Sequence, residues 1–128
     1  MAKILLVEDD EMFAALYKRQ FIAGGLEVDV AVTGADGLSA VAKGHYDLVL
    51  LDILLPDIDG TEVFRQMKAQ DASKNIPVVF LTNLSQEENI EKAFKLGAKG
   101  YLVKASYTPD QVVQEIKNFL EQNKPVAA

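Results

Sequence analysis

The chain has 128 residues, enough for one ordinary domain that buries roughly two thirds of the surface of its unfolded form. Apolar residues make up 49% and charged residues 25% of the sequence, which is typical of a soluble globular protein and not of a disordered or fibrous one. Thirteen basic and nineteen acidic residues give a net charge of −6, which argues against direct binding of nucleic acid or anionic lipid. The lack of cysteine excludes disulfides and cysteine-ligated zinc or iron–sulfur sites.

The beginning of the sequence offers no candidate signal peptide or membrane anchor. The apolar run Ile4–Val7 is far too short for either. We therefore expect a cytoplasmic protein without membrane insertion. Residues 1–122 are assigned to one domain, and residues 123–128 are expected to be a flexible tail or linker stub.

Five short segments have the composition of β-strands, and a helical segment follows each of them. The expected strands are 3–7, 27–32, 48–51, 78–81 with Thr82 at its end, and 100–103. Residues 48–51 are apolar without polar alternation, the pattern of a strand buried on both faces of a parallel sheet. The segment 27–32 is less apolar and is interpreted as an edge strand.

The five helical segments are predicted from their end signals and from apolar residues at helical spacing. The residues that mark the ends are Gly24 and Gly25 for the first helix, Thr33 and Gly44 for the second, Asp59 for the third, Ser85, Glu88 and Gly97 for the fourth, and Thr108, Pro109 and Gln111 for the fifth. The side chains expected to face inward are Phe13, Leu16, Tyr17, Phe21, Leu38, Val41, Ala42, Val63, Phe64, Met67, Ile90, Ala93, Phe94, Val112, Ile116, Phe119 and Leu120.

Strands that alternate with helices predict an α/β fold, a doubly wound five-stranded parallel sheet with five flanking helices and right-handed crossovers. Ligands of such sheets bind beyond the carboxyl ends of the strands. The polar residues expected at that edge are Glu8, Asp9 and Asp10 after the first strand, Asp52 after the third, Thr82 on the fourth and Lys104 after the fifth.

This set of side chains suits a metal ion and a phosphoryl group. Two carboxylates 4 Å apart repel by about 4 kcal/mol at an effective dielectric constant near 20, and a divalent cation relieves that repulsion. Oxygen ligands without histidine or cysteine favour Mg²⁺ or Mn²⁺. Asp52 can attack phosphorus to give an aspartyl phosphate, while Thr82 and Lys104 bind the remaining phosphoryl oxygens.

The motifs, taken in order and spacing, resemble the receiver domain of two-component response regulators over essentially the whole chain. The matching segments are 7–10, 52–60 with Pro56, Asp59 and Gly60, 80–82, and 100–104. The resemblance implies a flavodoxin-like sheet of strand order 2-1-3-4-5, as in chemotaxis regulators. It also implies a phosphorylation-operated signalling switch.

The resemblance implies specific roles for the strand-end residues. Glu8 and Asp9 look like the acidic pair of the family, with Asp9 the direct metal ligand, and Asp52 looks like the phosphoacceptor and a further metal ligand. The backbone carbonyl of Leu54 would also bind the metal. A histidine kinase or a phosphotransfer protein would donate the phosphoryl group.

The same resemblance assigns a switching hydroxyl to Thr82, phosphate binding to Lys104, and to Tyr101 an aromatic ring whose rotamer follows Thr82. Phosphorylation would then alter the face made by the fourth helix, the fifth strand and the fifth helix. The protein would catalyse only its own phosphorylation and dephosphorylation. The output partner is unknown, and a homodimer through this face is one alternative.

Three positions depart from the family pattern. Ala105 replaces the proline that usually follows the lysine, so we predict a trans bond after Lys104, because a non-proline cis bond costs about 2.5–4 kcal/mol. Asn83 replaces a small residue after the switching threonine. Leu54 and Leu84 are both apolar at positions that influence the attacking water, from which we predict slow autodephosphorylation.

Other functions remain open at this point. A metal-dependent aspartyl phosphohydrolase would need an Asp-x-Asp pair after the first strand, and a flavin carrier would need a phosphate loop there in place of acids. A phosphorylation-independent docking module is a further alternative. Asp57 is interpreted as a solvated loop acid and His45 as a solvated turn residue, each without a role in the site.

Overall fold

A computed structural model describes residues 1–122, so the interpretation of residues 123–128 lies outside the described part of the chain. Five parallel strands form a single sheet in the order β2-β1-β3-β4-β5. They are β1 (Lys3–Val7), β2 (Glu27–Ala31), β3 (Leu48–Leu51), β4 (Val78–Thr82) and β5 (Gly100–Val103). The predicted fold class and strand order are confirmed, and β2 is an edge strand as predicted, although it ends one residue before Val32.

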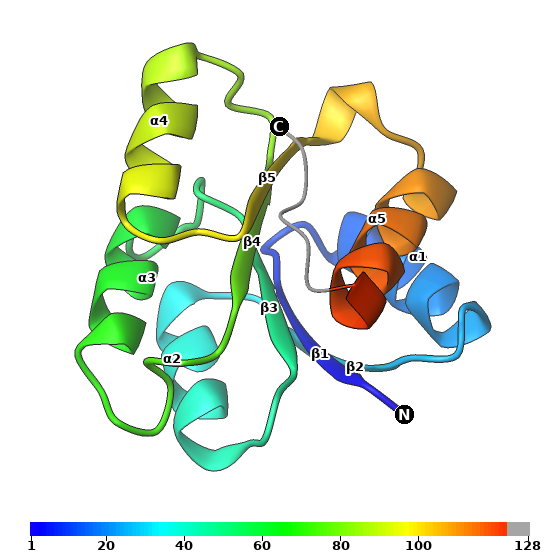
Figure 1. Ribbon diagram of the computed structural model, residues 1–128, viewed down its shortest axis with the longest axis horizontal. Coiled ribbons are helices and arrows are strands. Elements are labelled where there is room, and N and C mark those ends of the chain that lie inside the picture. The colour runs from blue at the N-terminus through cyan, green and yellow to red at the C-terminus, as the bar shows by residue number, and fades with distance from the viewer. Residues whose placement is uncertain (123–128) are drawn as a thin grey trace.

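Helices cover both faces of the sheet (Figure 1). On one face lie α1 (Glu11–Ala23) and α5 (Pro109–Gln122), and on the other lie α2 (Gly34–Lys43), α3 (Gly60–Lys68) and α4 (Glu87–Lys95). A short 3-10 helix, η1 (Lys104–Ser106), follows β5. None of the helices in residues 1–122 is long and apolar enough to cross a bilayer.

The core consists of two layers, one on each side of the sheet, and successive residues of β3 alternate between them. Leu48 and Leu50 belong to the layer beneath α1 and α5, whereas Val49 and Leu51 belong to the layer beneath α2 and α3. All four side chains are fully buried. A polar side chain in a strand covered on both faces would be buried without water and would destabilise the fold. This explains why the segment has no polar alternation.

Most of the predicted helix ends are confirmed. Thr33 Oγ1 accepts a hydrogen bond from the Asp36 N–H, and Asp59 Oδ1 accepts one from the Thr61 N–H. Thr108 Oγ1 accepts from the Gln111 N–H at 3.2 Å. The Gln111 carboxamide in turn accepts from the Thr108 N–H at 2.9 Å. This reciprocal pair satisfies two donors at the start of α5.

The capping box predicted at Ser85 and Glu88 is wrong. Helix α4 begins at Glu87, and its N-cap, Gln86, makes no side-chain cap hydrogen bond.

Three side chains expected to face inward are instead exposed: Leu16, Ala42 and Phe94. The reason is that each of these helices buries a narrower stripe of residues than predicted. The buried residues are Ala14, Tyr17 and Phe21 in α1, Gly34, Gly37 and Val41 in α2, and Ala93 in α4.

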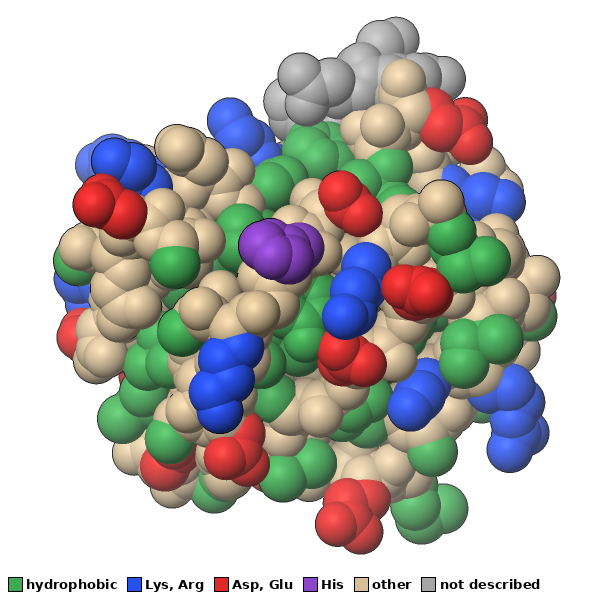
Figure 2. Space-filling model, turned by 90° about the horizontal axis from the view of Figure 1, so that it is seen from below, with side chains coloured by type: hydrophobic (Ala, Val, Ile, Leu, Met, Phe, Trp, Pro, Cys, Tyr) green, Lys and Arg blue, Asp and Glu red, His purple; other side chains and the backbone are tan. Residues whose placement is uncertain are grey.

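The face at the amino ends of the strands carries a mixed surface. Figure 2 views the molecule from below Figure 1 and shows basic and acidic side chains interspersed among apolar ones, with the histidine in purple. His45 is exposed there, as predicted for a turn residue. Because all five strands are parallel, the polar residues that follow them lie at the opposite edge of the sheet.

Candidate functional site

The register of the sheet places Glu8 and Asp52 side by side. Val7 pairs with Leu51, so the next residue of each strand lies at the same carboxyl edge. The Asp52 N–H donates to the Val7 carbonyl at 3.1 Å. Glu8 and Asp52 are only 1% and 5% exposed, whereas Asp9 is exposed. Carboxylate oxygens of Glu8, Asp9 and Asp52 lie within 4.8 Å of one another, which confirms that these three residues form one cluster.

The ammonium group of Lys104 bridges the two buried carboxylates. Its Nζ donates to Glu8 Oε1 at 2.5 Å and to Asp52 Oδ2 at 2.8 Å. It also lies 4.5 Å from the centroid of the Phe13 ring, a contact that adds a cation–π attraction. The sequence indicated Phe13 only as a core residue, because no local pattern connects α1 with the end of β5.

Burial and the neighbouring charged groups have opposite effects on the pKa values of Glu8 and Lys104. Burial raises the pKa of Glu8, and the hydrogen bond from Lys104 offsets only part of that effect. Burial lowers the pKa of Lys104, but hydrogen bonds and charges from Asp52 and Glu8 outweigh it, so that its pKa is raised. Lys104 is therefore a cation at neutral pH, and one ammonium faces three acidic side chains.

The oxygens of the cluster differ in their partners. Glu8 Oε2 accepts the Asp10 N–H at 3.1 Å, and Asp52 Oδ1 accepts the Leu54 N–H at 3.2 Å. None of the side-chain hydrogen bonds or ion pairs in residues 1–122 involves Asp9. An excess of negative charge and a donor set made only of oxygen fit Mg²⁺ or Mn²⁺, with Asp9 the carboxylate that is free to bind it.

Thr82 and Tyr101 meet at the backbone of Leu84. The Leu84 N–H donates to Thr82 Oγ1 at 3.4 Å, and the Tyr101 hydroxyl donates to the Leu84 carbonyl at 2.6 Å. Both side chains are fully buried. If the Thr82 hydroxyl moved, the Leu84 N–H would lose its acceptor. The carbonyl of the same residue accepts the hydrogen bond from Tyr101, so the two side chains are connected through Leu84.

Two backbone features shape the loops around Asp52 and Lys104. A side chain at Gly60 would place its Cβ 2.0 Å from the Asp52 carbonyl oxygen, so only glycine fits where α3 begins. Residues 1–122 contain no cis peptide bond, which confirms the trans bond predicted before Ala105. Leu54 is 56% exposed, whereas Leu84 is half-buried and packs against the core layer beneath α2 and α3.

Asp57 has a role that the sequence did not reveal. Its two carboxylate oxygens accept the N–H groups of Gly34 and Ala35, at 2.8 and 2.9 Å. Asp57 is an exposed loop acid, as predicted, but the prediction missed its two hydrogen bonds to α2. No local signal could have shown this contact, because the partners are more than twenty residues apart in the sequence.

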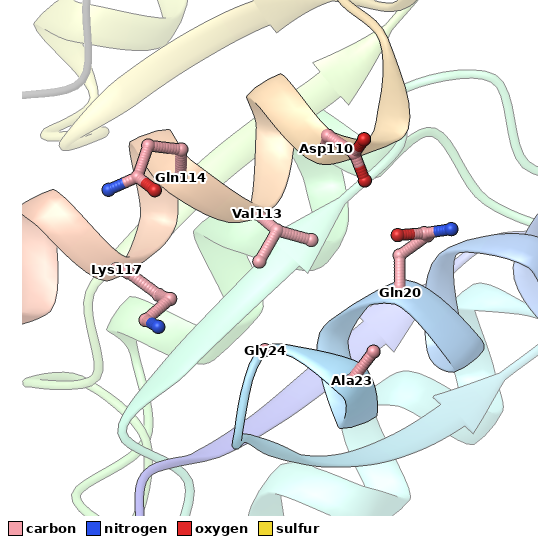
Figure 3. Close-up of a pocket in the computed structure, with 7 residues that line it drawn as sticks. All are labelled: Gln20, Ala23, Gly24, Asp110, Val113, Gln114 and Lys117. Carbon is pink, nitrogen blue, oxygen red and sulfur yellow. The ribbon is translucent and has the colours of Figure 1, made fainter.

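A groove of about 270 Å³ lies between α1 and α5 (Figure 3). Its lining residues are Gln20, Ala23, Gly24, Asp110, Val113, Gln114 and Lys117. It has one acidic and one basic side chain and shares no residue with the cluster. This groove is therefore not the candidate site.

The fold and the acidic crevice define a class of protein, a doubly wound α/β domain with an oxygen-rich charged site at the carboxyl edge of its sheet. Residues 4–117 match the response regulator receiver domain family. The chain therefore belongs to this family of two-component systems.

Two curated relatives are transcriptional regulators. CusR of Escherichia coli (strain K12) is 37% identical over 102 residues, which cover 80% of this chain and 44% of CusR. PcoR of Escherichia coli is 31% identical over 128 residues, which cover 100% of this chain and 55% of PcoR. The chain thus spans about half the length of the curated relatives that it matches.

A solved structure with the same fold is a CheY-like response regulator receiver domain protein from Methanospirillum hungatei JF-1. It superposes with a TM-score of 0.85 at 30% identity and covers 95% of both chains. The phosphorylated cyanobacterial phytochrome response regulator RcpA superposes with a TM-score of 0.82 at 28% identity, again with 95% of both chains covered.

Proposed function

We propose that this chain is a phosphorylation-operated signalling switch that accepts a phosphoryl group on Asp52 from a phosphohistidine of a histidine kinase or phosphotransfer protein. The observation that carries the proposal is the buried Asp52 carboxylate, held by Lys104 beside Glu8 and Asp9. The likeness to a phosphorylated response regulator supports it.

In the transfer step, a carboxylate oxygen of Asp52 forms a bond to phosphorus while the phosphorus–nitrogen bond of the donor histidine breaks. The electron pair of the broken bond stays on the imidazole. Lys104, which contacts Asp52 Oδ2 at 2.8 Å, lies where its ammonium group can bind a phosphoryl oxygen once the carboxylate has become an acyl phosphate. The reaction needs positioning and charge compensation more than acid–base chemistry, which suits a site with no histidine.

A Mg²⁺ ion, or Mn²⁺ in its place, would compensate the charge of the phosphoryl oxygens when bound. Asp9, Asp52 and the Leu54 carbonyl are the ligands we propose, with Glu8 completing the acidic pair. Glu8 and Asp52 also accept backbone N–H groups, which fix the direction of their carboxylates. Two of the proposed acidic residues, Glu8 and Asp52, would therefore already be oriented when the ion binds.

The same geometry supports the proposed switch. If the Thr82 hydroxyl turns to a phosphoryl oxygen on Asp52, the Leu84 N–H loses its acceptor and the segment before α4 is released. Tyr101, which donates to the Leu84 carbonyl, would respond to that change. The output face would be α4, β5 and α5, read by an unknown partner or by a second copy of the chain.

The alternatives are less well supported by the residues. A phosphohydrolase of the Asp-x-Asp type is disfavoured because Leu54, and not an acid, stands two positions after Asp52. A flavin phosphate would meet the carboxylates of Glu8 and Asp9 after β1. We therefore propose a cytoplasmic switch that turns over only its own aspartyl phosphate, slowly if the apolar side chains of Leu54 and Leu84 exclude the attacking water.

The proposal is tested by incubating the protein with Mg²⁺ and labelled acetyl phosphate. The parent should take up an acid-stable, base-labile label, and both Asp52→Asn and removal of Mg²⁺ with a chelator should abolish it. Asp71→Asn is the matched control, because within residues 1–122 the ion pair of this exposed acid is with Lys74 at the surface. Parental labelling of Asp52→Asn would contradict the proposal.

A further inference from the structure

The loop between β3 and α3, residues 52–59, is tied to the beginning of α2. Asp57 accepts the N–H groups of Gly34 and Ala35, the first two residues of α2. Thr33 accepts the N–H of Asp36, the third residue. The first amides of a helix have no partner within the helix. Here a local residue, Thr33, satisfies one of them and a distant loop residue satisfies two.

A second contact holds the same loop against the same helix turn. A Cβ at Gly34 would lie 2.4 Å from Ile58 Cγ1, so the loop packs directly on the space that glycine leaves open. Ile58 is half-buried and packs against the core layer beneath α2 and α3. Asp57 and Ile58 together therefore fix the loop to α2 by two hydrogen bonds and one apolar contact.

The N-terminal half of α2 also contacts the strand that carries the acidic pair. A Cβ at Gly37 would lie 3.1 Å from Val7 Cγ2, and Val7 directly precedes Glu8. Helix α2 thus touches both chain segments that supply the proposed metal ligands, one at the end of β1 and one after β3. The pairing of β1 with β3 fixes the ends of the two strands, and α2 adds a support for the loop that follows β3.

We propose that Asp57 is a positioning residue for phosphoryl transfer, because its carboxylate fixes the β3–α3 loop to α2 and thereby holds the backbone of Leu54 at the metal site. This inference rests on the proposed function. Asp57 belongs neither to the carboxylate cluster nor to the contacts of Lys104, so it acts only through the loop.

The charge state of Asp57 suits this role. The hydrogen bonds from Ala35 and Gly34 lower the pKa of its carboxyl group, so the group is ionised at neutral pH. Its two bonds are therefore charge-assisted and stronger than bonds between neutral groups. They also place a negative charge at the positive end of the α2 dipole.

The first test uses no metal and compares Asp57→Ala and Asp57→Asn with Thr33→Ala by amide hydrogen exchange. Thr33 caps the same helix but has no hydrogen bond to the loop, so it is the matched control. The reporters are the N–H groups of Leu55 and Gly60, which both donate to the Ile53 carbonyl. Asp57→Ala should exchange these amides faster than the parent, whereas Thr33→Ala should leave them unchanged.

The second test measures Mg²⁺ affinity by titration of the NMR spectrum without a phosphodonor. Removing a residue that orients metal ligands typically weakens affinity by about tenfold or more, which is the effect expected for Asp57→Ala. Asp57→Asn keeps one acceptor oxygen and should lie between it and the parent. Thr33→Ala should bind Mg²⁺ as the parent does.

Equal effects of Asp57→Ala and Thr33→Ala on both loop exchange and Mg²⁺ affinity would overturn the inference, since Asp57 would then be an ordinary helix cap. The proposed function would stand in that case if Asp52 still takes the label. If the parent takes no label, the proposed function fails, and the exchange comparison still decides whether Asp57 holds the loop.

Discussion

Tyr46 connects the beginning of β3 with the edge of the sheet. Its hydroxyl donates to Asp29 Oδ2 at 2.7 Å, and Lys3 Nζ lies 3.5 Å from the same oxygen. The hydrogen bond from Tyr46 is the main cause that lowers the pKa of Asp29 below its ordinary value of 3.8. Burial and the bond to Asp29 raise the pKa of Tyr46 to about 12.

We expect Tyr46→Phe to raise the pKa of Asp29 toward its ordinary value, which an NMR titration of the carboxyl group would measure. A folded pKa below the unfolded one stabilises the protein fully above about pH 4, and this stabilisation is lost as the pH falls through the folded pKa. The difference in unfolding free energy between parent and variant should therefore be constant at neutral pH and shrink in acid. An unchanged pKa of Asp29 in Tyr46→Phe would contradict this account.

At the residue scale, the candidate site residues that the sequence indicated are those that the topology of the sheet delivers to one edge. Glu8, Asp52, Thr82 and Lys104 all belong to strand ends, and parallel strands deliver their carboxyl ends to one edge. Asp57 could not be predicted in this way, because its partners depend on how a loop folds back on α2.

At the scale of single elements, helix ends were predictable where a side chain serves its own helix. The pair of Thr108 and Gln111 is local and forms as predicted, whereas Ser85 and Glu88 have the same spacing and form no cap. The difference lies in where the helix begins: α5 begins at Pro109, directly after Thr108, but α4 begins two residues after Ser85. A one-residue shift removes Ser85 from the capping position.

These two sites give a matched pair of substitutions. Thr108→Ala should lower the free energy of unfolding by about 1 kcal/mol, because it removes the acceptor for the Gln111 N–H. Ser85→Ala should change it by less than about 0.5 kcal/mol, since Ser85 is exposed and caps nothing. Urea denaturation of the parent and both variants measures the two values. Equal losses of unfolding free energy in the two variants would show that the Thr108 cap does not stabilise the beginning of α5.

At the scale of the whole molecule, alternation of strands with helices was sufficient to predict the architecture. The apolar runs 48–51 in β3 and 78–81 in β4 are buried on both faces, and their lack of polar residues indicated that helices cover both sides of the sheet. What sequence patterns could not supply is the charge balance of the assembled site. One lysine faces three acids there, and two of these acids are almost fully buried.

That imbalance predicts that Mg²⁺ stabilises the whole fold. At a concentration about 100 times its Kd, the ion should add about 2.7 kcal/mol to the free energy of unfolding, which corresponds to roughly 10 °C in Tm. Asp9→Asn should lose this response, and its metal-free Tm should be at least that of the parent, because the exposed Asp9 makes no side-chain hydrogen bond within residues 1–122 and its neutralisation relieves repulsion in the cluster. A calorimetric scan with NaCl at matched ionic strength is the control. An equal rise in Tm for Asp9→Asn would argue against the proposed ligand.

The central claim is that Asp52 itself carries the phosphoryl group, and reductive trapping tests it most directly. Borohydride reduces an aspartyl phosphate to homoserine, which peptide sequencing by mass spectrometry locates. After incubation with Mg²⁺ and acetyl phosphate, we predict homoserine at position 52 and none at Asp9 or Asp57. Homoserine at another acidic residue, or none at position 52 in a protein that has taken up the label, would contradict the account.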